Sequence, residues 1–317
     1  MVLKDEVLRR LREAAGPVSG QELARELGVS RNAVWKAVQA LRREGCAIGS
    51  GTNRGYCLLR ESDALDAGEI SALLEDRTVP VYVLETVDST SSECRRRLAG
   101  GEGRCLVLAR QQTGGRGRNG KSFFSPPDTG LYMSAALRLD MSRVDAVGIT
   151  TYAAVCVAGA IRDVTGLDCG VKWVNDVYYQ GKKVCGILTE AVSSFEDDRA
   201  LSAIVGIGVN LHPSAVPEGL ENIVGFLDCG AVKNRLAAEI INRLMRYDPD
   251  DRGYLEQYRE LSVVLSRRIS YVSGGVTHSG IAVDIDGSGG LVVDADDAGR
   301  VTLSSGEISL TAIEGIK

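Results

Sequence analysis

GGRGRNGKSFFSP, spanning residues 114–126, is the stretch around which the rest of the sequence is organised. Four glycines, two arginines and one lysine occupy its first eight positions. Glycine lets a backbone pass close to a ligand, and arginine presents a planar charged fork that matches carboxylate and phosphate. We therefore predict a mobile anion-binding loop that closes over its substrate.

The same stretch also fits a P-loop pattern, because Gly115 begins a GxxxxGKS sequence. That pattern works only where a strand enters the loop and a helix leaves it. Residues 105–109 suit a strand, but two prolines at 126 and 127 disfavour a following helix. A P-loop NTPase is the less favoured alternative, and an ordinary solvated basic loop is a third interpretation.

Length and composition are those of a globular protein with two or three domains. The chain has 317 residues, of which 44% are hydrophobic and 25% are charged. No apolar run reaches the length of a membrane span, and the N-terminus lacks a secretory segment. We expect a cytosolic protein with no membrane partner.

Cysteine and histidine are placed in a way that argues against a zinc site. The eight cysteines are scattered, none forms a C-x-x-C pair, and the only histidines are His212 and His278. Several cysteines lie in apolar runs. We expect them to be reduced residues of the core.

The charge distribution separates the N-terminal segment from the rest. The net charge is −5, but residues 1–60 hold 11 Lys and Arg against 6 Asp and Glu. A basic segment on an acidic protein is typical of nucleic-acid binding.

The N-terminal segment has the pattern of a winged helix-turn-helix. Helical spacing over 4–15 is followed by a capped short helix, a turn at residues 28–30, and a longer helix to residue 44. Residues 46–59 then predict a β-hairpin, the wing. A three-helix interaction module without DNA is the alternative, and Trp35 could be either a core anchor or a base contact. The DNA-contact candidates are Ser19, Ser30, Arg31, Asn32, Trp35, Lys36, Gln39, Asn53 and Arg54.

The middle of the chain alternates strands and helices. We predict helices over 62–77, 92–98 and 147–164, and strands over 79–87, 105–109, 131–137 and 201–210. Small hydroxyl residues from Ser89 to Ser92 precede the second helix. They are either N-caps or hydrogen-bonding groups for a polar ligand head.

A second motif lies at residues 171–190. Two apolar strands, 171–179 and 182–190, predict a β-hairpin. Lys172, Asn175, Asp176 and Lys183 interrupt these apolar runs. Because buried charge is costly unless it is paired or used, these residues favour a phosphate and metal site over a solvated sheet face.

The ordered set of motifs resembles the biotin protein ligases, most closely the bifunctional kind that also represses the biotin operon. The resemblance rests on residues 115–126, on KWVND at 172–176, on KVCGILTE at 183–190 and on GIGVN at 206–210. With the winged helix and residues 306–310, it covers nearly the whole chain.

The resemblance implies an α+β protein of three domains. These are a winged helix-turn-helix over 1–62, a class II synthetase-like mixed sheet with helices over 63–266, and an SH3-like barrel over 267–317. It also implies ATP-dependent formation of biotinyl-5′-AMP, Mg²⁺, transfer to a lysine of a biotin carboxyl carrier protein, a homodimer and operator DNA. Short β runs and glycine turns in the tail agree with the barrel.

The resemblance also implies roles for individual residues. Catalytic roles fall to Lys183, Arg118 and Asp176, with Asp176 also holding metal. Biotin-binding roles fall to Ser89, Thr90, Ser91, Gln112, Gly115, Arg116, Gly117, Arg118, Lys183 and Gly186. ATP-binding roles fall to Arg116, Arg118, Phe123, Lys172, Asn175, Lys183 and Asn210.

Two alternatives to the bifunctional ligase remain. One is a ligand-sensing repressor with a silent catalytic domain, which the presence of Arg116, Arg118 and Lys183 argues against. The other is a lipoate-adenylating ligase, whose substrate lacks a ureido head.

Overall fold

The computed structural model describes residues 3–14, 16–43, 45–51, 55–60, 62–140, 145–193, 200–304, 306 and 308–310. The chain forms two compact units. The first comprises Met1–Ala64 with Gly230–Lys233, and the second comprises Leu65–Cys229 with Asn234–Lys317. The three finer domain boundaries given above stay predictions.

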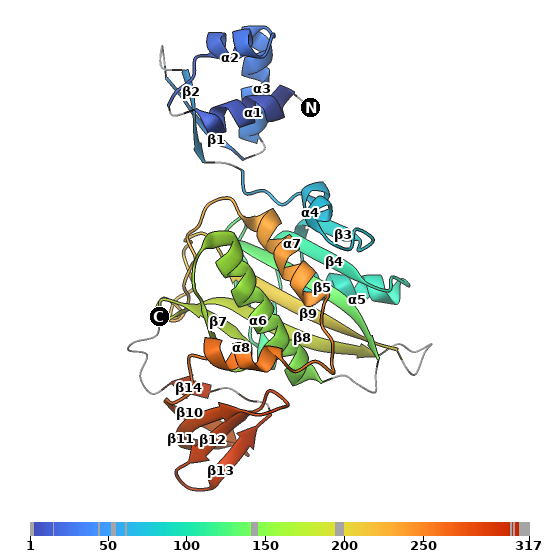
Figure 1. Ribbon diagram of the computed structural model, residues 1–317, viewed down its shortest axis with the longest axis vertical. Helices are drawn as coiled ribbons and strands as arrows, with labels where there is room; N and C mark the ends of the chain where they lie inside the picture. Colours follow the sequence, from blue (N-terminus) through green and yellow to red (C-terminus); the bar gives the residue numbers. More distant parts are fainter. Residues whose placement is uncertain are drawn as a thin grey trace. The chain divides into compact units, whose positions relative to one another are not determined.

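The first unit contains the predicted winged helix-turn-helix elements. Ser19 Oγ accepts a hydrogen bond from Glu22 N at 3.0 Å, and Ser30 Oγ accepts one from Ala33 N at 3.1 Å. Each hydroxyl therefore caps the helix that follows it. The elements are α1 (Leu3–Glu13), α2 (Gly20–Glu26), α3 (Arg31–Arg43), β1 (Ala47–Gly51) and β2 (Gly55–Arg60), as Figure 1 shows.

The core of this unit follows the predicted helical spacing. Val34 and Val38 of α3 are fully buried and pack with Leu23 of α2 and Val7 of α1. Trp35 is 51% exposed. The core-anchor interpretation of Trp35 is therefore wrong, because helical geometry turns this position away from the face that carries its neighbours.

The second unit is built on a seven-stranded mixed sheet. Strands β3 and β4 are parallel, and every other neighbouring pair is antiparallel. The strand order is β3-β4-β5-β9-β8-β7-β6, so the three strands β9, β8 and β7, each with polar residues at one end, are neighbours in the sheet. The strands are β3 (Val81–Val87), β4 (Cys105–Gln112), β5 (Gly130–Asp140), β6 (Gly170–Lys172), β7 (Asp176–Tyr179), β8 (Lys182–Ser193) and β9 (Ala200–Asn210).

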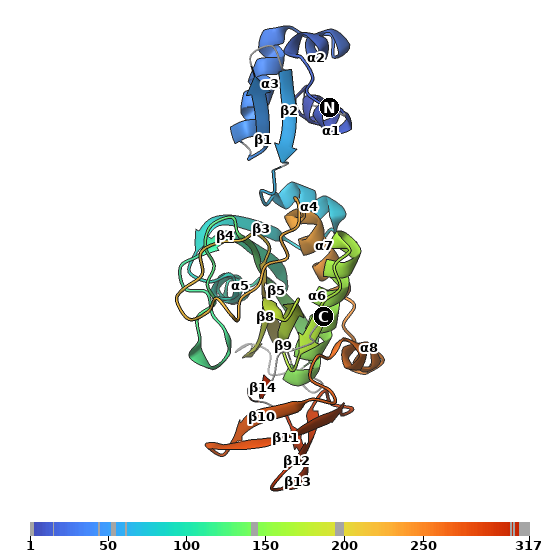
Figure 2. The same cartoon turned by 90° about the vertical axis from the view of Figure 1, so that its left-hand side faces the viewer.

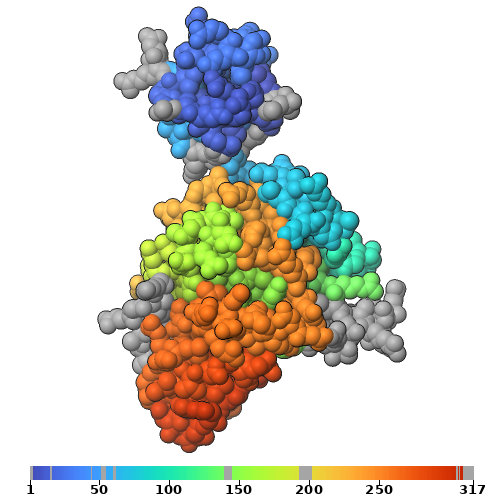
Figure 3. All heavy atoms as spheres, viewed as in Figure 1, coloured from blue at the N-terminus to red at the C-terminus, as the bar shows by residue number. Residues whose placement is uncertain are grey.

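Helices cover both faces of this sheet, as the predicted fold class requires. Helix α5 (Thr90–Ala99) lies on one face, and α6 (Ala146–Thr165) lies on the other with α7 (Lys233–Leu244) (Figure 2). Figure 3 shows α6, α7 and α8 (Tyr254–Leu261) at the surface on this side. Helix α6 has the length and hydropathy of a membrane span, but 67% of its most apolar window is buried in the protein, as in a core helix.

Two predicted elements differ from the structure. The expected strand 171–179 is two strands, because residues 173–175 make a tight turn that sets Lys172 opposite Asp176. Asn175 fastens this turn to β8, since its backbone carbonyl accepts from Ile187 N and its Nδ2 donates to Ile187 O. The expected helix 62–77 is shorter, α4 (Ala67–Leu73), because Asp66 caps its start by accepting from Glu69 N.

The C-terminal part is the predicted small β domain. Five strands form an antiparallel sheet in the order β13-β12-β11-β10-β14. Gly274 and Gly275 have φ of 58° and 80°, so the first predicted turn needs glycine. The strands are β10 (Arg268–Ser273), β11 (Val276–Ile285), β12 (Leu291–Ala295), β13 (Gly299–Leu303) and β14 (Ile308–Leu310).

Candidate active site

A cavity of about 440 Å³ lies between the glycine–arginine loop (residues 114–126) and strands β7, β8 and β9. Its size falls in the range of roughly 300–1,000 Å³ that is usual for small-molecule sites. Nearly all the predicted biotin and ATP residues meet here. The predicted residues that line it are Ser89, Thr90, Ser91, Gln112, Arg116, Gly117, Arg118, Phe123, Lys172, Asn175, Asp176, Lys183, Gly186 and Asn210.

The glycine–arginine loop is a small irregular hairpin. Gly117 N donates to Lys121 O at 2.7 Å, and Phe123 N donates to Gly115 O at 2.9 Å. Only one turn of 3₁₀ helix, Arg118–Gly120, interrupts it, and no helix lies between residue 121 and β5. The P-loop alternative is therefore wrong. The mobility of the loop stays a prediction.

Gly115 does not line the cavity but allows the loop to close on the strand beneath it. A Cβ atom at this position would lie 2.4 Å from Phe123 O and 2.8 Å from Ser125 Oγ. Any other residue would push the loop away from Gln112, whose Nε2 lies 3.2 Å from the same point. The role of Gly115 is thus to bring loop and strand together.

One end of the cavity presents neutral hydrogen-bonding groups. Ser89 occupies the N-cap position of α5, but its side chain makes no capping hydrogen bond, so its hydroxyl is left for another role. Gln112 Oε1 accepts from Thr90 N at 2.9 Å and from Thr90 Oγ1 at 3.2 Å. Ser89, Thr90 and Ser91 are all at most 5% exposed. Buried groups of this kind are suited to a polar ligand head that has matching donors and acceptors.

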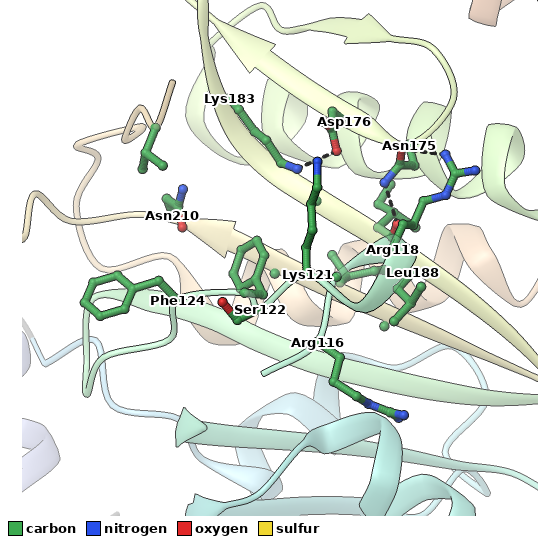
Figure 4. Close-up of a pocket in the computed structure, with 18 of the residues that line it drawn as sticks. Arg116, Arg118, Lys121, Ser122, Phe124, Asn175, Asp176, Lys183, Leu188 and Asn210 are labelled. Atoms are coloured by element: carbon green, nitrogen blue, oxygen red, sulfur yellow. Dashed lines mark hydrogen bonds and ion pairs between the residues drawn. The ribbon is translucent and has the colours of Figure 1, made fainter. Parts of the chain in front are cut away.

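The other end is cationic. Lys183 Nζ lies 2.7 Å from Asp176 Oδ1, and Figure 4 shows the Lys121 side chain directed toward this pair. Arg118 Nη1 donates to Asn175 Oδ1 at 3.2 Å and to Gly306 O at 3.4 Å. Four cations, Arg118, Lys121, Lys172 and Lys183, line the cavity near one carboxylate. This arrangement is suited to the phosphates of a nucleotide.

Arg116 was predicted to bind the substrate anion, but in the structure its side chain pairs with a carboxylate of the protein. Its guanidinium pairs with Glu190 of β8 at 3.0 Å, and Arg95 of α5 pairs with the other oxygen of Glu190 at 3.1 Å. In Figure 4 the Arg116 side chain points away from the pair formed by Asp176 and Lys183. The prediction of a direct anion contact by Arg116 therefore requires this side chain to leave Glu190.

Glycines of the sheet form the floor of the cavity. The Phe123 ring lies on Gly208 of β9, where a Cβ would come within 2.4 Å of it, and on Gly186 of β8, where the distance would be 3.2 Å. Tyr132 meets the Phe123 ring edge-on at 6.5 Å, and burial raises the pKa of Tyr132 to about 12. The two glycines therefore leave the room that the Phe123 ring occupies.

Buried tyrosines support the turn that carries the polar residues. Tyr258 donates its hydroxyl hydrogen to Val174 O at 3.2 Å. Burial raises the pKa of Tyr258 well above its ordinary value, so the phenol remains a donor at neutral pH. Burial, with Asp176 nearby, also raises the pKa of Tyr178 to about 12.

Metal ligands are sparse in the described part of the chain. No cluster of three His, Cys, Asp or Glu residues occurs there, and all eight cysteines are free thiols. Asp176 is the one carboxylate among the described residues that line the cavity. Its Oδ1 is buried and makes no hydrogen bond of ordinary geometry, although it is in an ion pair with Lys183.

Sequence reasoning missed some residues of the site. Lys121, Tyr132 and the backbone of Gly306 all belong to the cavity wall. Lys121 lies within the loop that drew attention to the site, so its charge could have identified it. Tyr132 lies in an apolar strand, and no feature of its neighbours pointed to the cavity.

Comparison with known proteins gives the family. Residues 83–210 match the biotin/lipoate A/B protein ligase family, residues 4–57 match an HTH domain, and residues 268–311 match the biotin protein ligase C-terminal domain. The chain is 32% identical to the bifunctional ligase/repressor BirA of Bacillus subtilis over 92% of its own length and 94% of that protein. The chain belongs to the biotin protein ligase family.

Other members of the biotin protein ligase family give the same result. The bifunctional ligase/repressor BirA of Escherichia coli is 30% identical over 93% of this chain and 94% of that protein. The biotin protein ligase of Aquifex aeolicus, solved in complex with biotin and ATP, superimposes with a TM-score of 0.60 at 25% identity. It covers 73% of this chain and 98% of that structure. The predicted family and fold class are confirmed.

This biotin protein ligase also carries a candidate DNA-binding face. Arg31, Asn32, Trp35 and Lys36 are exposed on α3, and Gln39 is half-buried beside them. Ser19 and Ser30 are exposed at the helix starts that they cap. The remaining two candidates, Asn53 and Arg54, lie outside the described residues.

Proposed function

We propose that this protein is an ATP-dependent biotin protein ligase that is also a biotin-dependent transcriptional repressor of the cytoplasm. It joins biotin and ATP into biotinyl-5′-AMP and transfers biotin to a lysine of a biotin carboxyl carrier protein. The observation that carries this proposal is one cavity with a neutral hydrogen-bonding end and a cationic end. Such a cavity fits the biotinyl adenylate, which has a bicyclic urea in one half and a nucleotide in the other.

Biotin is placed with its ureido ring at the neutral end. Ser89, Thr90, Ser91 and Gln112 supply donors and acceptors there, all buried or half-buried. The backbone of Arg116 and Gly117 and the floor at Gly186 flank the rest of the molecule, and Gly115 lets this part of the loop approach the strand beneath it. A urea held by matched polar groups is selected over a head that cannot pair with them, because unmatched buried groups are costly. This favours biotin over lipoate.

ATP is placed at the cationic end. The biotin carboxylate oxygen attacks the α-phosphorus, the bond to the bridging oxygen breaks, and pyrophosphate leaves. Arg118 and Lys183 neutralise charge on the phosphate oxygens as the new bond forms. Arg116 moves from Glu190 to the carboxylate and phosphate. Lys172, Asn175 and Asn210 bind the remainder of the nucleotide, and Phe123 covers the adenine.

The residues present fit a magnesium ion that arrives with ATP. Mg²⁺ is usually held by one or two carboxylates together with substrate phosphates, and Asp176 is a half-buried carboxylate at the cationic end. Asp176 would hold the ion. When bound, the ion would offset charge on the departing pyrophosphate.

The second step needs the adenylate to be shielded from water. The ε-amine of the carrier lysine attacks the carbonyl carbon of the mixed anhydride, and the bond to AMP breaks. Arg118 ties the glycine–arginine loop to Asn175 and to Gly306, so the loop forms a wall over the reacting atoms. A closed wall protects a reactive anhydride until the carrier arrives.

Repression follows from the same intermediate. Biotinyl-5′-AMP promotes homodimerisation, and the dimer places two α3 helices in operator half-sites a whole number of helical turns apart. The ligand shifts the dimer equilibrium only by its different affinity for the two states. The exposed basic and aromatic face of α3 supports this role.

Two assays test this function. Adenylate formation, read as release of pyrophosphate, should require biotin, and lipoate in its place should give no product. Operator gel shifts should be stronger with biotin and ATP than without them. Equal affinity in both conditions would remove the corepressor role, and absence of pyrophosphate release would leave only a ligand-sensing repressor.

A further inference from the structure

A continuous run of side-chain hydrogen bonds lies behind the neutral end of the cavity. We call it the hydroxyl relay, and it links α5, β5, β4 and the glycine–arginine loop. Its bonds are Ser91 Oγ to Ser134 Oγ at 3.0 Å, Ser134 Oγ to Thr90 Oγ1 at 2.7 Å, Thr90 Oγ1 to Gln112 Oε1 at 3.2 Å, Gln112 Nε2 to Ser125 Oγ at 2.9 Å and Ser125 Oγ to Phe123 O at 3.0 Å.

The bond between Thr90 and Gln112 fixes the direction of the protons. Gln112 Oε1 accepts from the backbone N–H of Thr90, so this atom is the amide oxygen and cannot donate. The Thr90 hydroxyl must therefore spend its one proton on Gln112. It then has no proton for Ser134, and Ser134 must donate to it across the 2.7 Å contact.

The same reasoning extends to Ser91. Because the Ser134 proton is already used, Ser91 must donate to Ser134. All three hydroxyl protons thus point along one direction, from Ser91 through Ser134 and Thr90 to Gln112. What remains on Thr90 and Ser91 for a ligand is lone pairs, which can only accept.

Ser134 is at the centre of the relay but outside the cavity wall. It is fully buried on β5, and its hydroxyl contacts two residues that do line the cavity. Gly206 on the neighbouring strand leaves the room, because a Cβ there would lie 2.7 Å from Ser91 Oγ. Ser134 therefore reaches the ligand only through Thr90 and Ser91.

We propose that Ser134 is a positioning residue that sets the specificity for the ureido group: it takes the Ser91 proton, which leaves Ser91 an acceptor, and it holds in place the Thr90 oxygen that Gln112 already makes an acceptor. This inference rests on the proposed function. The ureido N–H groups meet the two acceptors, while the ureido oxygen takes hydrogen bonds from the Ser89 hydroxyl and the second N–H of Gln112. Ser125 holds the far end of the relay and connects the ureido site to the loop through the Phe123 carbonyl.

Steady-state kinetics of Ser134→Ala and Ser125→Ala test the proposal. Each variant should raise the KM for biotin by roughly three- to ten-fold, the effect of one lost hydrogen bond on binding. The kcat and the KM for ATP should stay within about two-fold of wild type, since the lost contact is equal in ground and transition states. Biotin titrations without ATP should show the same loss of affinity.

Thr150→Val is the matched control. Thr150 carries a buried hydroxyl that bonds to Thr189 at 2.9 Å, and neither residue lines the cavity. This variant should keep the wild-type KM for biotin. If Ser134→Ala lowers the melting temperature below the assay range, the KM for biotin of Ser125→Ala, a substitution in the loop, provides the test.

The outcomes separate the inference from the proposed function. Unchanged KM for biotin in folded Ser134→Ala and Ser125→Ala would overturn the inference alone, as would an equal loss of affinity for biotin and ATP. A wild-type protein that neither binds biotin nor releases pyrophosphate would overturn the proposed function, and the inference with it.

Discussion

Lys183 and Asp176 form an ion pair across the β7–β8 hairpin, with Nζ and Oδ1 2.7 Å apart at the wall of the cavity. The two residues are seven positions apart, yet the tight turn between the strands sets them beside each other. The pair directs the Lys183 ammonium to the place where the α-phosphate is proposed to lie.

Removing Lys183 tests that role. Lys183→Ala should lower the rate of adenylate formation by roughly 100-fold or more, the loss typical of one group that stabilises transition-state charge. Single-turnover release of pyrophosphate measures it. Lys182→Ala is the control. This substitution removes the same charge from the adjacent position, but the Lys182 ammonium donates a hydrogen bond to Glu221 O. A wild-type rate in Lys183→Ala would contradict the assignment.

Loss of Arg118 should open the wall over the intermediate. Arg118→Gly removes the hydrogen bonds to Asn175 and Gly306, so biotinyl-5′-AMP should escape into solution. Free adenylate, measured by chromatography, should accumulate, and bystander proteins should become biotinylated. Arg110→Ala, which removes ion pairs to Glu85 and Asp128 outside the cavity, should retain the intermediate. Retention in Arg118→Gly would count against the shielding role.

Glu190 holds Arg116 in the resting state, so the two should compete. Glu190→Gln should tighten binding of biotin or its adenylate by up to about five-fold, because a partly exposed ion pair no longer has to break. Titration calorimetry at low and high salt checks this, and the gain should shrink with salt. Glu85→Gln is the control. Weaker binding in Glu190→Gln would instead show that Glu190 orients Arg116 for the substrate.

The aromatic ring of Trp35 is exposed on α3 and does not belong to the buried core of the first unit. Trp35→Ala should weaken operator binding at least about five-fold, the effect of losing one good contact, while biotin ligation stays at the wild-type rate. Gel shifts with biotin and ATP present measure the first quantity. Leu73→Ala, which truncates a half-exposed side chain of α4, should leave DNA affinity unchanged. Equal affinity of Trp35→Ala and wild type would remove Trp35 from the interface.

Asp88 should make a stability contribution that depends on pH. The hydrogen bond from Arg96 lowers the pKa of Asp88 to about 2 from its ordinary value of 3.8. The contribution is therefore present above the unfolded-state pKa and is lost as pH falls toward the folded-state pKa. Both side chains are half-exposed, so it amounts to less than about 0.5 kcal/mol.

Urea unfolding of Asp88→Asn measures this difference. The variant should be less stable than wild type at neutral pH, and the gap should narrow between about pH 4 and pH 2. A gap that widened on acidification would reverse the sign of the coupling.

The sequence revealed those parts of the site that are local in the chain. The glycine–arginine loop, the Ser89–Ser91 cluster and the charged residues of 172–183 stand out because each breaks the pattern expected for its surroundings. Chemistry that needs charge in an apolar setting leaves such breaks. The structure placed nearly all of them around one cavity.

Contacts between distant segments could not be predicted in this way. Ser134 is an ordinary small residue in an apolar strand, and only the sheet brings it to Thr90. Glu190 lies 74 positions from Arg116, so their contact leaves no local pattern in the sequence. The turn at residues 173–175 was not predicted, because residues 171–179 have the composition of one continuous strand. Periodicity cannot distinguish one long strand from two short ones when both are apolar.

The central claim is that one cavity joins biotin to a nucleotide and passes the biotinyl group to a carrier lysine. The most direct test is incubation of the purified protein with biotin, ATP and a biotin carboxyl carrier domain, followed by intact-mass measurement of that domain. The account predicts a mass increase of one biotinyl group that disappears when ATP is omitted or the acceptor lysine is replaced. An unchanged carrier mass in the presence of folded protein and both substrates would contradict it.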